Sequence, residues 1–109
     1  MIDEILQSAG FVQDSTYRQA TFLKPPSQPF AVYFDNEDTS GSSDLTCDVI
    51  EHNLRIELYS PEVPAADRER AIESALKSCG LHYDKTGRIW IQSERYYLTV
   101  YDFDYIEKE

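Results

Sequence analysis

Four residues of this chain belong to the types that bind zinc: Cys47, His52, Cys79 and His82. Their spacing argues against a shared site. Positions 47 and 52 differ by an odd number, so a regular strand directs the two side chains to opposite faces. Neither Cys–His pair has the tight spacing of a zinc motif. We therefore expect no metal and no cofactor, and two reduced, largely buried cysteines.

Asp102 and Asp104 lie two residues apart, so a strand would direct both carboxylates to one face. Such a pair can share a proton or bind a cation. However, 20 of the 109 residues are acidic, and a pair of this kind arises readily by chance. The chain contains no G-x-S-x-G motif and no glycine-rich phosphate loop. We expect that the protein is not an enzyme.

The segment between residues 93 and 109, SERYYLTVYDFDYIEKE, is rich in aromatic residues. A period of two places one set on a single side of a strand: Tyr97, Thr99, Tyr101, Phe103 and Tyr105. RNA-binding sheets also display aromatic rings, but they combine them with Lys and Arg, whereas these neighbours are acids. Tyr96, Leu98 and Val100 make the opposite side apolar as well, which predicts a strand with protein on both faces.

Tyrosine is enriched at protein interfaces, so one of these covers could be a neighbouring subunit. We combine the tyrosine side of this strand with the odd-numbered side of the strand predicted at residues 49–59. The predicted subunit interface comprises Arg55, Glu57, Tyr59, Tyr97 and Tyr101.

The elements that must position these residues are readable from hydrophobic periodicity. Residues 1–9 have a short helical stripe that ends at Gly10, and residues 64–79 form the clearest helix, which ends at Gly80. The apolar stripe of the second helix consists of Ala71, Ile72, Ala75, Leu76 and Cys79. One helical face of this kind is typical of a helix that packs on a sheet.

The strands are predicted from alternation and turn residues. Residues 49–59 alternate over a long stretch, with the even-numbered side toward the core. Residues 30–34 and 95–106 are further strands, and residues 81–91 read as strand, turn and strand around DKTG. An irregular early strand is expected within residues 11–23. The fold class is therefore α+β: a mainly antiparallel or mixed sheet of about five strands, with a short N-terminal helix and one longer helix packed on it.

Residues 35–44, DNEDTSGSSD, contain no apolar side chain. This composition predicts an exposed, mobile loop at the tip of a long hairpin, within a single domain that spans residues 1–109. We regard the loop as a candidate docking segment, with Asp35, Glu37, Asp38 and Asp44 as its acidic residues.

The charge balance is strongly acidic, with 10 Lys plus Arg against 20 Asp plus Glu and a net charge of −10. Nucleic acid and anionic membrane surfaces should repel such a protein. The sequence has no apolar run long enough to span a membrane and no secretory signal pattern. We therefore expect no direct binding to nucleic acid, no membrane association and no signal-directed secretion.

The order of these segments resembles a known family. PPSQPFAVYF precedes the acidic loop and HNLRIELYSP; the helix ADRERAIESALKSCGLHYDK and the strand WIQSERYYLTVYDFDY then follow. This succession is similar to the small tail terminator or tail-completion (head–tail joining) proteins of long-tailed bacteriophages and prophages of Gram-positive bacteria. The resemblance spans nearly the whole chain and depends on order and spacing, not on a catalytic signature.

The resemblance implies a structural protein of virion assembly. Such proteins form a homo-oligomeric ring, usually of six subunits, that ends the tail tube and joins it to the neck of the capsid. The implied partners are copies of the chain itself, the tail tube protein and the head or neck connector protein. The implied location is the virion neck, or the bacterial host cytoplasm during assembly. A closed ring of this kind repeats a heterologous interface by rotation.

One alternative of a different class remains open. A small acidic protein could mimic the charge of DNA and inhibit a DNA-binding or DNA-processing protein through rows of Asp and Glu. A mimic should display acids along its exposed strand, whereas a ring subunit should display tyrosines there. The face formed by residues 97–105 therefore discriminates between the two functions.

Overall fold

The computed structural model describes residues 2–20, 26, 28–38, 49–61 and 63–108. These residues form the predicted α+β fold, with two helices and a five-stranded mixed sheet. In chain order the elements are α1 (Ile2–Ser8), β1 (Tyr17–Gln19), β2 (Phe30–Asp38), β3 (Val49–Pro61), α2 (Ala66–Ser78), β4 (Tyr83–Ile91) and β5 (Tyr96–Lys108). The early strand expected within residues 11–23 is β1.

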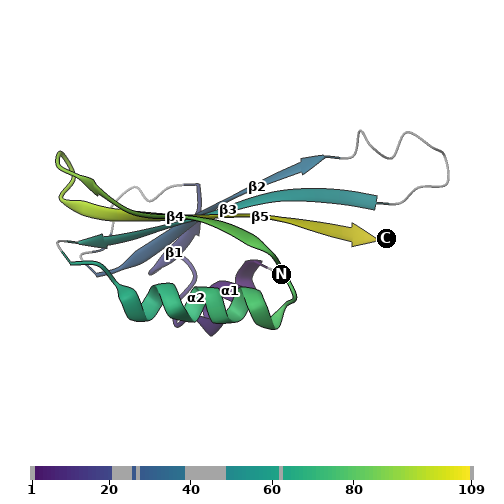
Figure 1. Ribbon diagram of the computed structural model, residues 1–109, viewed down its shortest axis with the longest axis horizontal. Coiled ribbons are helices and arrows are strands. Elements are labelled where there is room, and N and C mark those ends of the chain that lie inside the picture. The colour runs from purple at the N-terminus through teal and green to yellow at the C-terminus, as the bar shows by residue number, and fades with distance from the viewer. Residues whose placement is uncertain (1, 21–25, 27, 39–48, 62, 109) are drawn as a thin grey trace.

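The strands lie in the order β1-β2-β3-β5-β4. Every neighbouring pair is antiparallel except β1 and β2, which are parallel. Both helices pack on the same face of the sheet, as Figure 1 shows. In the described part of the chain, no helix covers the opposite face, which we call the open face.

The covered face holds the core. Leu54, Ile56 and Leu58 of β3 point toward the helices and are almost completely buried, so the predicted even-numbered core side is confirmed. From the helices, the main contributors are Ile5, Leu6, Ile72 and Leu76. Burial of each of these side chains contributes about 1.5–3 kcal/mol. Helices as short as these are not stable alone, so their stability comes from docking on the sheet.

Gly10 allows α1 to end against α2. Its φ of 91° is a left-handed conformation that favours glycine, and the Arg68 side chain occupies the space that a Cβ would need. The Arg68 guanidinium donates a 2.7 Å hydrogen bond to the carbonyl of Ala9 and lies over the ring of Phe11. Arg68 thus satisfies a helix C-terminal carbonyl and ties the two helices together.

The apolar stripe of α2 is shorter than predicted. Ile72 and Leu76 are fully buried, whereas Cys79 lies at the C-cap and is exposed. The prediction of a buried Cys79 is therefore wrong, because the helix ends before another turn can face the sheet. Cys47 lies outside the described residues.

One turn prediction is also corrected. DKTG is not a hairpin turn, because β4 runs through it and only shifts its register between Thr86 and Ile89. Arg88, with a φ of 44°, accommodates this irregularity, which has the character of a β-bulge. Between β4 and β5 the chain turns, and the Arg95 amide donates to the Ile91 carbonyl at 2.8 Å.

Beyond the helices, three strands continue as a projecting ribbon, which we call the arm (Figure 1). The arm contains the end of β2, the beginning of β3 and the end of β5, in register from Asp38↔Glu51 to Val49↔Lys108. It gives the chain extents of 50 × 28 × 23 Å and a radius of gyration of 15.0 Å. A compact chain of this length would have a radius of about 13 Å.

The arm changes the interpretation of the acidic segment. Residues 35–38 belong to β2 and pair with β3, so the prediction that a loop begins at Asp35 is wrong. Asp35, Glu37 and Asp38 are strand residues, because cross-strand pairing with the long β3 overrides their low strand propensity. Asp44, with the rest of the predicted loop, lies outside the described residues.

Candidate functional site

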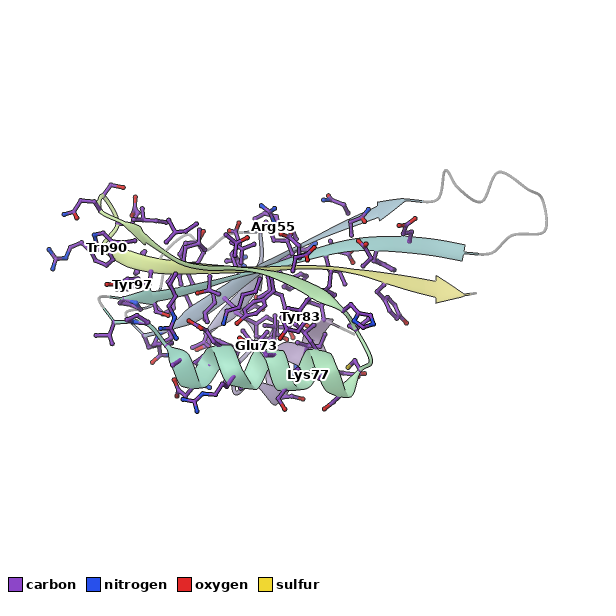
Figure 2. The ribbon with its side chains drawn as sticks, in the orientation of Figure 1. Arg55, Glu73, Lys77, Tyr83, Trp90 and Tyr97 are labelled. Carbon is purple, nitrogen blue, oxygen red and sulfur yellow. The ribbon has the colours of Figure 1, made fainter. Side chains whose placement is uncertain are left out.

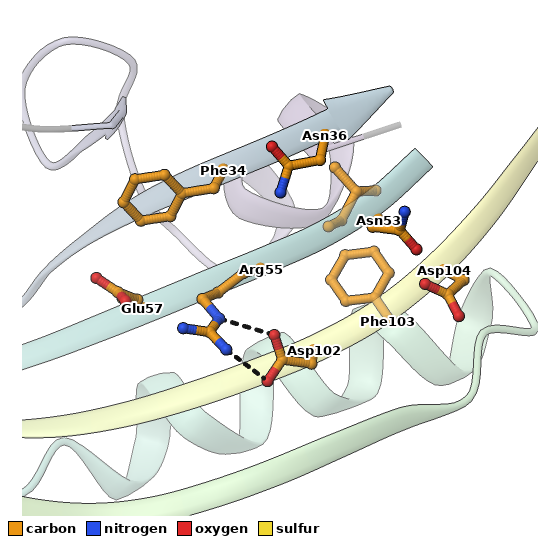
Figure 3. Close-up of a pocket in the computed structure, with 9 residues that line it drawn as sticks. Phe34, Asn36, Asn53, Arg55, Glu57, Asp102, Phe103 and Asp104 are labelled. Carbon is orange, nitrogen blue, oxygen red and sulfur yellow. Dashed lines mark hydrogen bonds and ion pairs between the residues drawn. The ribbon is translucent and has the colours of Figure 1, made fainter. Parts of the chain in front are cut away.

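The open face divides into an aromatic part and a charged part. Over the body of the sheet, the rings of Phe30, Tyr59 and Tyr96 pack together, with centroids 5.2–6.0 Å apart. Toward the arm, Arg55 Nε donates a 2.8 Å hydrogen bond to the carboxylate of Asp102 on the adjacent strand (Figure 3). This charge-assisted bond raises the pKa of Arg55 above its usual value.

An open hollow of about 360 Å³ surrounds the Arg55–Asp102 pair. Figure 3 shows residues that line it, which come from β2, β3 and β5: Phe34, Asn36, Asn53, Arg55, Glu57, Asp102, Phe103 and Asp104. Asp102 and Asp104 share this face, as predicted from their spacing. The Asp102 carboxylate is engaged by Arg55, so the two acids do not form a free carboxylate pair.

Arg55, Glu57 and Tyr59 lie on the open face, where they are exposed or half-buried. Tyr59 is partly enclosed by the aromatic rings and donates a 2.9 Å hydrogen bond to Glu57. Burial, together with this bond to a carboxylate, raises the pKa of Tyr59 to about 12. These three predicted interface residues remain accessible to a partner.

Tyr97 and Tyr101 lie on the other face, beneath α2. Tyr101 is fully buried, and its hydroxyl donates a 2.8 Å hydrogen bond to Glu73. Burial and the adjacent carboxylate raise the pKa of Tyr101 far above its usual value. The prediction that Tyr101 contacts another subunit is wrong, because odd-numbered residues of β5 face the chain's own helix. Tyr97 shares this side but is half-buried near the β4–β5 hairpin, where its ring packs on Trp90 (Figure 2).

A buried carboxylate that the sequence did not reveal holds β4 against α2. Glu69 is 3% exposed, and its oxygens accept hydrogen bonds from Arg88 at 3.0 Å, Lys85 at 3.1 Å and Thr99 at 3.3 Å. Lys85 also reaches Glu73 at 2.8 Å, and Figure 2 shows Glu73 between α2 and the sheet. This arrangement satisfies the buried charge and stabilises the position of the edge strand.

Burial opposes the ionisation of Glu69, but the hydrogen bonds from Arg88 and Lys85 outweigh it and lower the pKa. At Glu73, burial is again outweighed, here by the bonds from Lys85 and Tyr101, so that pKa is also lowered. Both carboxylates are therefore ionised and paired at neutral pH. Groups that are fully engaged in this way are suited to holding structure together, not to exchanging protons with a substrate.

Three of the four zinc-type residues are described, His52, Cys79 and His82, and they do not come together in a metal site. His52 is buried in the arm, with Nδ1 2.8 Å from a carboxylate oxygen of Asp35 and its ring beside Tyr105. His82 is exposed after α2, near Cys79 in the sequence. Within the described residues, no three His, Cys, Asp or Glu side chains come together in a group that could hold a metal ion.

The outermost strand, β4, presents large apolar side chains to solvent. Ile89 is 46% exposed and Trp90 is 38% exposed, and as neighbours in a strand they point to opposite faces. Among the described residues, only Val12 and Val63 are other large hydrophobic residues with comparable exposure. The apolar end of β4 and the acidic arm lie at opposite ends of the molecule (Figures 1 and 2).

The helices of the described chain are too short or too polar to cross a lipid bilayer. A scan of known protein families finds no match to this chain, and a search of curated proteins also finds none. These comparisons assign the chain to no family.

Proposed function

We propose that the protein is a structural subunit of phage assembly, which ends the tail tube and joins it to the head as a homo-oligomeric ring. The observation that carries this proposal is the shape of the subunit. Its three-stranded arm extends past the helices at one end, and an apolar edge strand is exposed at the other end. Both features provide surface for protein contacts that a self-contained small domain does not need.

The chemistry of the interior supports the same conclusion. Between α2 and the sheet, Lys85 donates hydrogen bonds to both Glu69 and Glu73, and the Tyr101 hydroxyl donates to Glu73. These bonds stabilise the fold. The hollow around Arg55 and Asp102 is open, and the ion pair crosses it. These charged and tyrosine side chains thus hold the subunit itself together. The rest of the open face, the arm and the outer edge of β4 are left for contacts with partners.

A charge mimic of DNA is the second candidate, because the open face carries a run of acids. Asp84 lies directly opposite Asp102 in the register of β4 and β5, and Asp104 follows on the same side. Against it, Arg55 engages Asp102, and over the body of the sheet the open face is aromatic. Tight binding of the purified chain to a DNA-processing enzyme, with no affinity for tail tubes, would favour this candidate over the ring.

The proposal is tested by incubating the purified protein with preassembled tubes of the tail tube protein from the same genome. We expect the protein to sediment with the tubes and, after gold labelling, to lie at tube ends. Label that is spread along the tubes, or protein that stays in the supernatant, would contradict a terminating role. Bovine serum albumin at the same concentration controls for trapping.

A further inference from the structure

Within the described residues, the directions of the backbone hydrogen-bonding groups identify two sheet edges with no strand paired to them. The Ala31 amide donates to Thr16 at 2.8 Å, and the Tyr33 carbonyl accepts from Ala20 at 2.9 Å. Odd-numbered residues of β2 therefore direct their N–H and C=O groups away from β3. The same alternation applies to Asp35 and Glu37, which lie beyond the pairing with β1. Among the described residues, no strand pairs with this outer edge of the arm.

The residue pairs between neighbouring strands show in the same way which backbone groups of β4 point outward. In β5 the even-numbered residues direct their backbone groups toward β4, where their partners are Asp84, Thr86, Ile89 and Ile91. Tyr83, Lys85 and Trp90 therefore direct their N–H and C=O groups outward, away from the sheet. In the part of the chain that the structure describes, β4 is the last strand on this side.

The end of β4 lacks the usual protection of an edge strand. Natural edges are commonly protected by charged residues, prolines or bulges, since an unprotected edge pairs with other chains. The first half of β4 has Lys85 and the bulge near Arg88, but the final segment is Ile89, Trp90 and Ile91. A strand added at this edge would pair with the outward backbone groups and would cover the exposed side chains on both faces.

The charges at the two ends of the molecule favour a second copy as the occupant. The arm carries Asp35, Glu51 and Asp104, whereas the hairpin end carries Arg88 and Arg95 with a single acid, Glu94. The Arg88 side chain is 47% exposed even while it pairs with Glu69. An acidic arm and a hairpin with exposed arginine are complementary in a head-to-tail arrangement and repel each other in a head-to-head one.

Strand direction permits the same arrangement. Successive antiparallel pairings place β2 and β5 in one direction and β3 and β4 in the other. A neighbour whose sheet continues this one in the same orientation would place its β2 antiparallel to β4. Antiparallel pairing is the geometry of most of this sheet already.

We propose that β4 of one copy binds the outer edge of the arm of the next copy, around Asp35 and Glu37, as an added antiparallel strand. The contact is heterologous, so each copy uses one edge at each end and the arrangement can close into a ring. The inference rests on the proposed function, because a homo-oligomeric ring requires copies of the chain to bind each other. It goes further by naming the two surfaces that form this contact.

The experiment measures the mass of the full chain by sedimentation velocity, from micromolar to near-millimolar concentration. The Trp90→Glu variant places a carboxylate at the β4 edge, where it repels the acidic arm. The Glu37→Pro variant removes an outward amide from β2 but leaves the amides that bond to β3. Val63→Glu is the matched control, because Val63 is equally a large exposed hydrophobic residue but lies outside the sheet.

We expect the wild type and Val63→Glu to rise above the single-chain mass of 12.6 kDa with concentration, while each edge variant stays at that mass. A mixture of the two edge variants should form dimers and nothing larger, because one retains an intact arm and the other an intact β4. Circular dichroism spectra like that of the wild type establish that the variants are folded.

A wild type that stays at the single-chain mass throughout would overturn this inference, as would edge variants that associate like the wild type. Absence of dimers in the mixture would overturn the heterologous pairing. These results are independent of the tube-binding assay, because a chain that binds tube ends through another surface would fail here and still terminate tails.

Discussion

The hydroxyl of Tyr101 lies 2.8 Å from a carboxylate oxygen of Glu73, in the layer between β5 and α2. The tyrosine ring faces its own helix, and Lys85 binds the same carboxylate oxygen from β4. Tyr101, which the sequence predicts at a subunit interface, is thus part of the contact that joins the sheet to α2. Two carboxylates, Glu69 and Glu73, organise this contact.

Tyr101→Phe should lower the free energy of unfolding by about 1–2 kcal/mol, because it removes a hydrogen bond to a charged acceptor while the ring stays packed. Urea unfolding followed by far-UV circular dichroism measures the change. Tyr97→Phe is the control on the same strand and side, since its hydroxyl has no hydrogen-bond partner among the described residues. Equal effects of the two substitutions would contradict the assigned role of the Tyr101 hydroxyl.

Tyr101→Asp should unfold the protein instead of yielding a folded monomer. It leaves a cavity and places a carboxylate beside Glu73 and Glu69, at a cost of more than about 3 kcal/mol. The measurement is the far-UV circular dichroism signal at neutral pH. A spectrum like that of the wild type, combined with lost self-association, would restore Tyr101 to the subunit interface.

Stability should fall in acid because Glu69 and Glu73 titrate at lower pH in the folded chain than in the unfolded chain. A lowered folded-state pKa gives stability that is fully present above the unfolded pKa, near 4.5, and is lost as pH falls through the folded pKa. We expect the urea midpoint to be nearly constant from pH 7 to about 5 and to decrease below.

The matched variant is Glu69→Gln, which should already be less stable at pH 7, because Arg88 and Lys85 lose a charged acceptor. Its urea midpoint should depend less on pH than that of the wild type, since one of the two titrating groups is gone. An unchanged pH dependence in this variant would show that acid sensitivity arises from other carboxylates.

Backbone amides of β2 should alternate in hydrogen exchange when the protein is dilute. Asn36 directs its amide toward β3 and should exchange slowly, whereas Asp35 and Glu37 direct theirs outward and should exchange fast. Residue-resolved exchange by NMR measures this directly. Uniformly fast exchange at all three residues would contradict the extension of β2 into the arm.

The Cys79 thiol should react with Ellman's reagent in the folded protein, because it is exposed at the end of α2. The measurement uses the Cys47→Ser variant, so that a single thiol is titrated without denaturant. We expect complete reaction at a rate near that of a small thiol. A thiol that reacts only in denaturant would instead support the burial that the helical stripe predicted.

Much of the fold was predictable, because periodicity reports burial directly. The even-numbered residues of β3 alternate with polar residues, and Ile56 and Leu58 are fully buried as this pattern predicts. Gly10 and Gly80 both have positive φ at the ends of α1 and α2, where a stop was predicted. Local patterns were sufficient where one element and its own side chains decided the structure.

The remaining features depend on partners that are distant in the sequence. By its position in the sequence Glu69 is an ordinary acid of an amphipathic helix, but Lys85 and Arg88 reach it from a strand 16 and 19 residues later. One signal was present: Glu69 and Glu73 share a helical face with Ile72 and Leu76. Likewise, residues 35–38 look like a loop by composition and become a strand only because β3 extends beside them.

The most direct test of the central claim is the length of tail tubes that polymerise with and without this protein. A terminating subunit should stop elongation, so the mean tube length in negative-stain images should decrease as the protein is added. The Trp90→Glu variant should shorten tubes less, while Val63→Glu should act like the wild type. Tubes whose length distribution does not change at any concentration of the wild-type protein would contradict the proposed function.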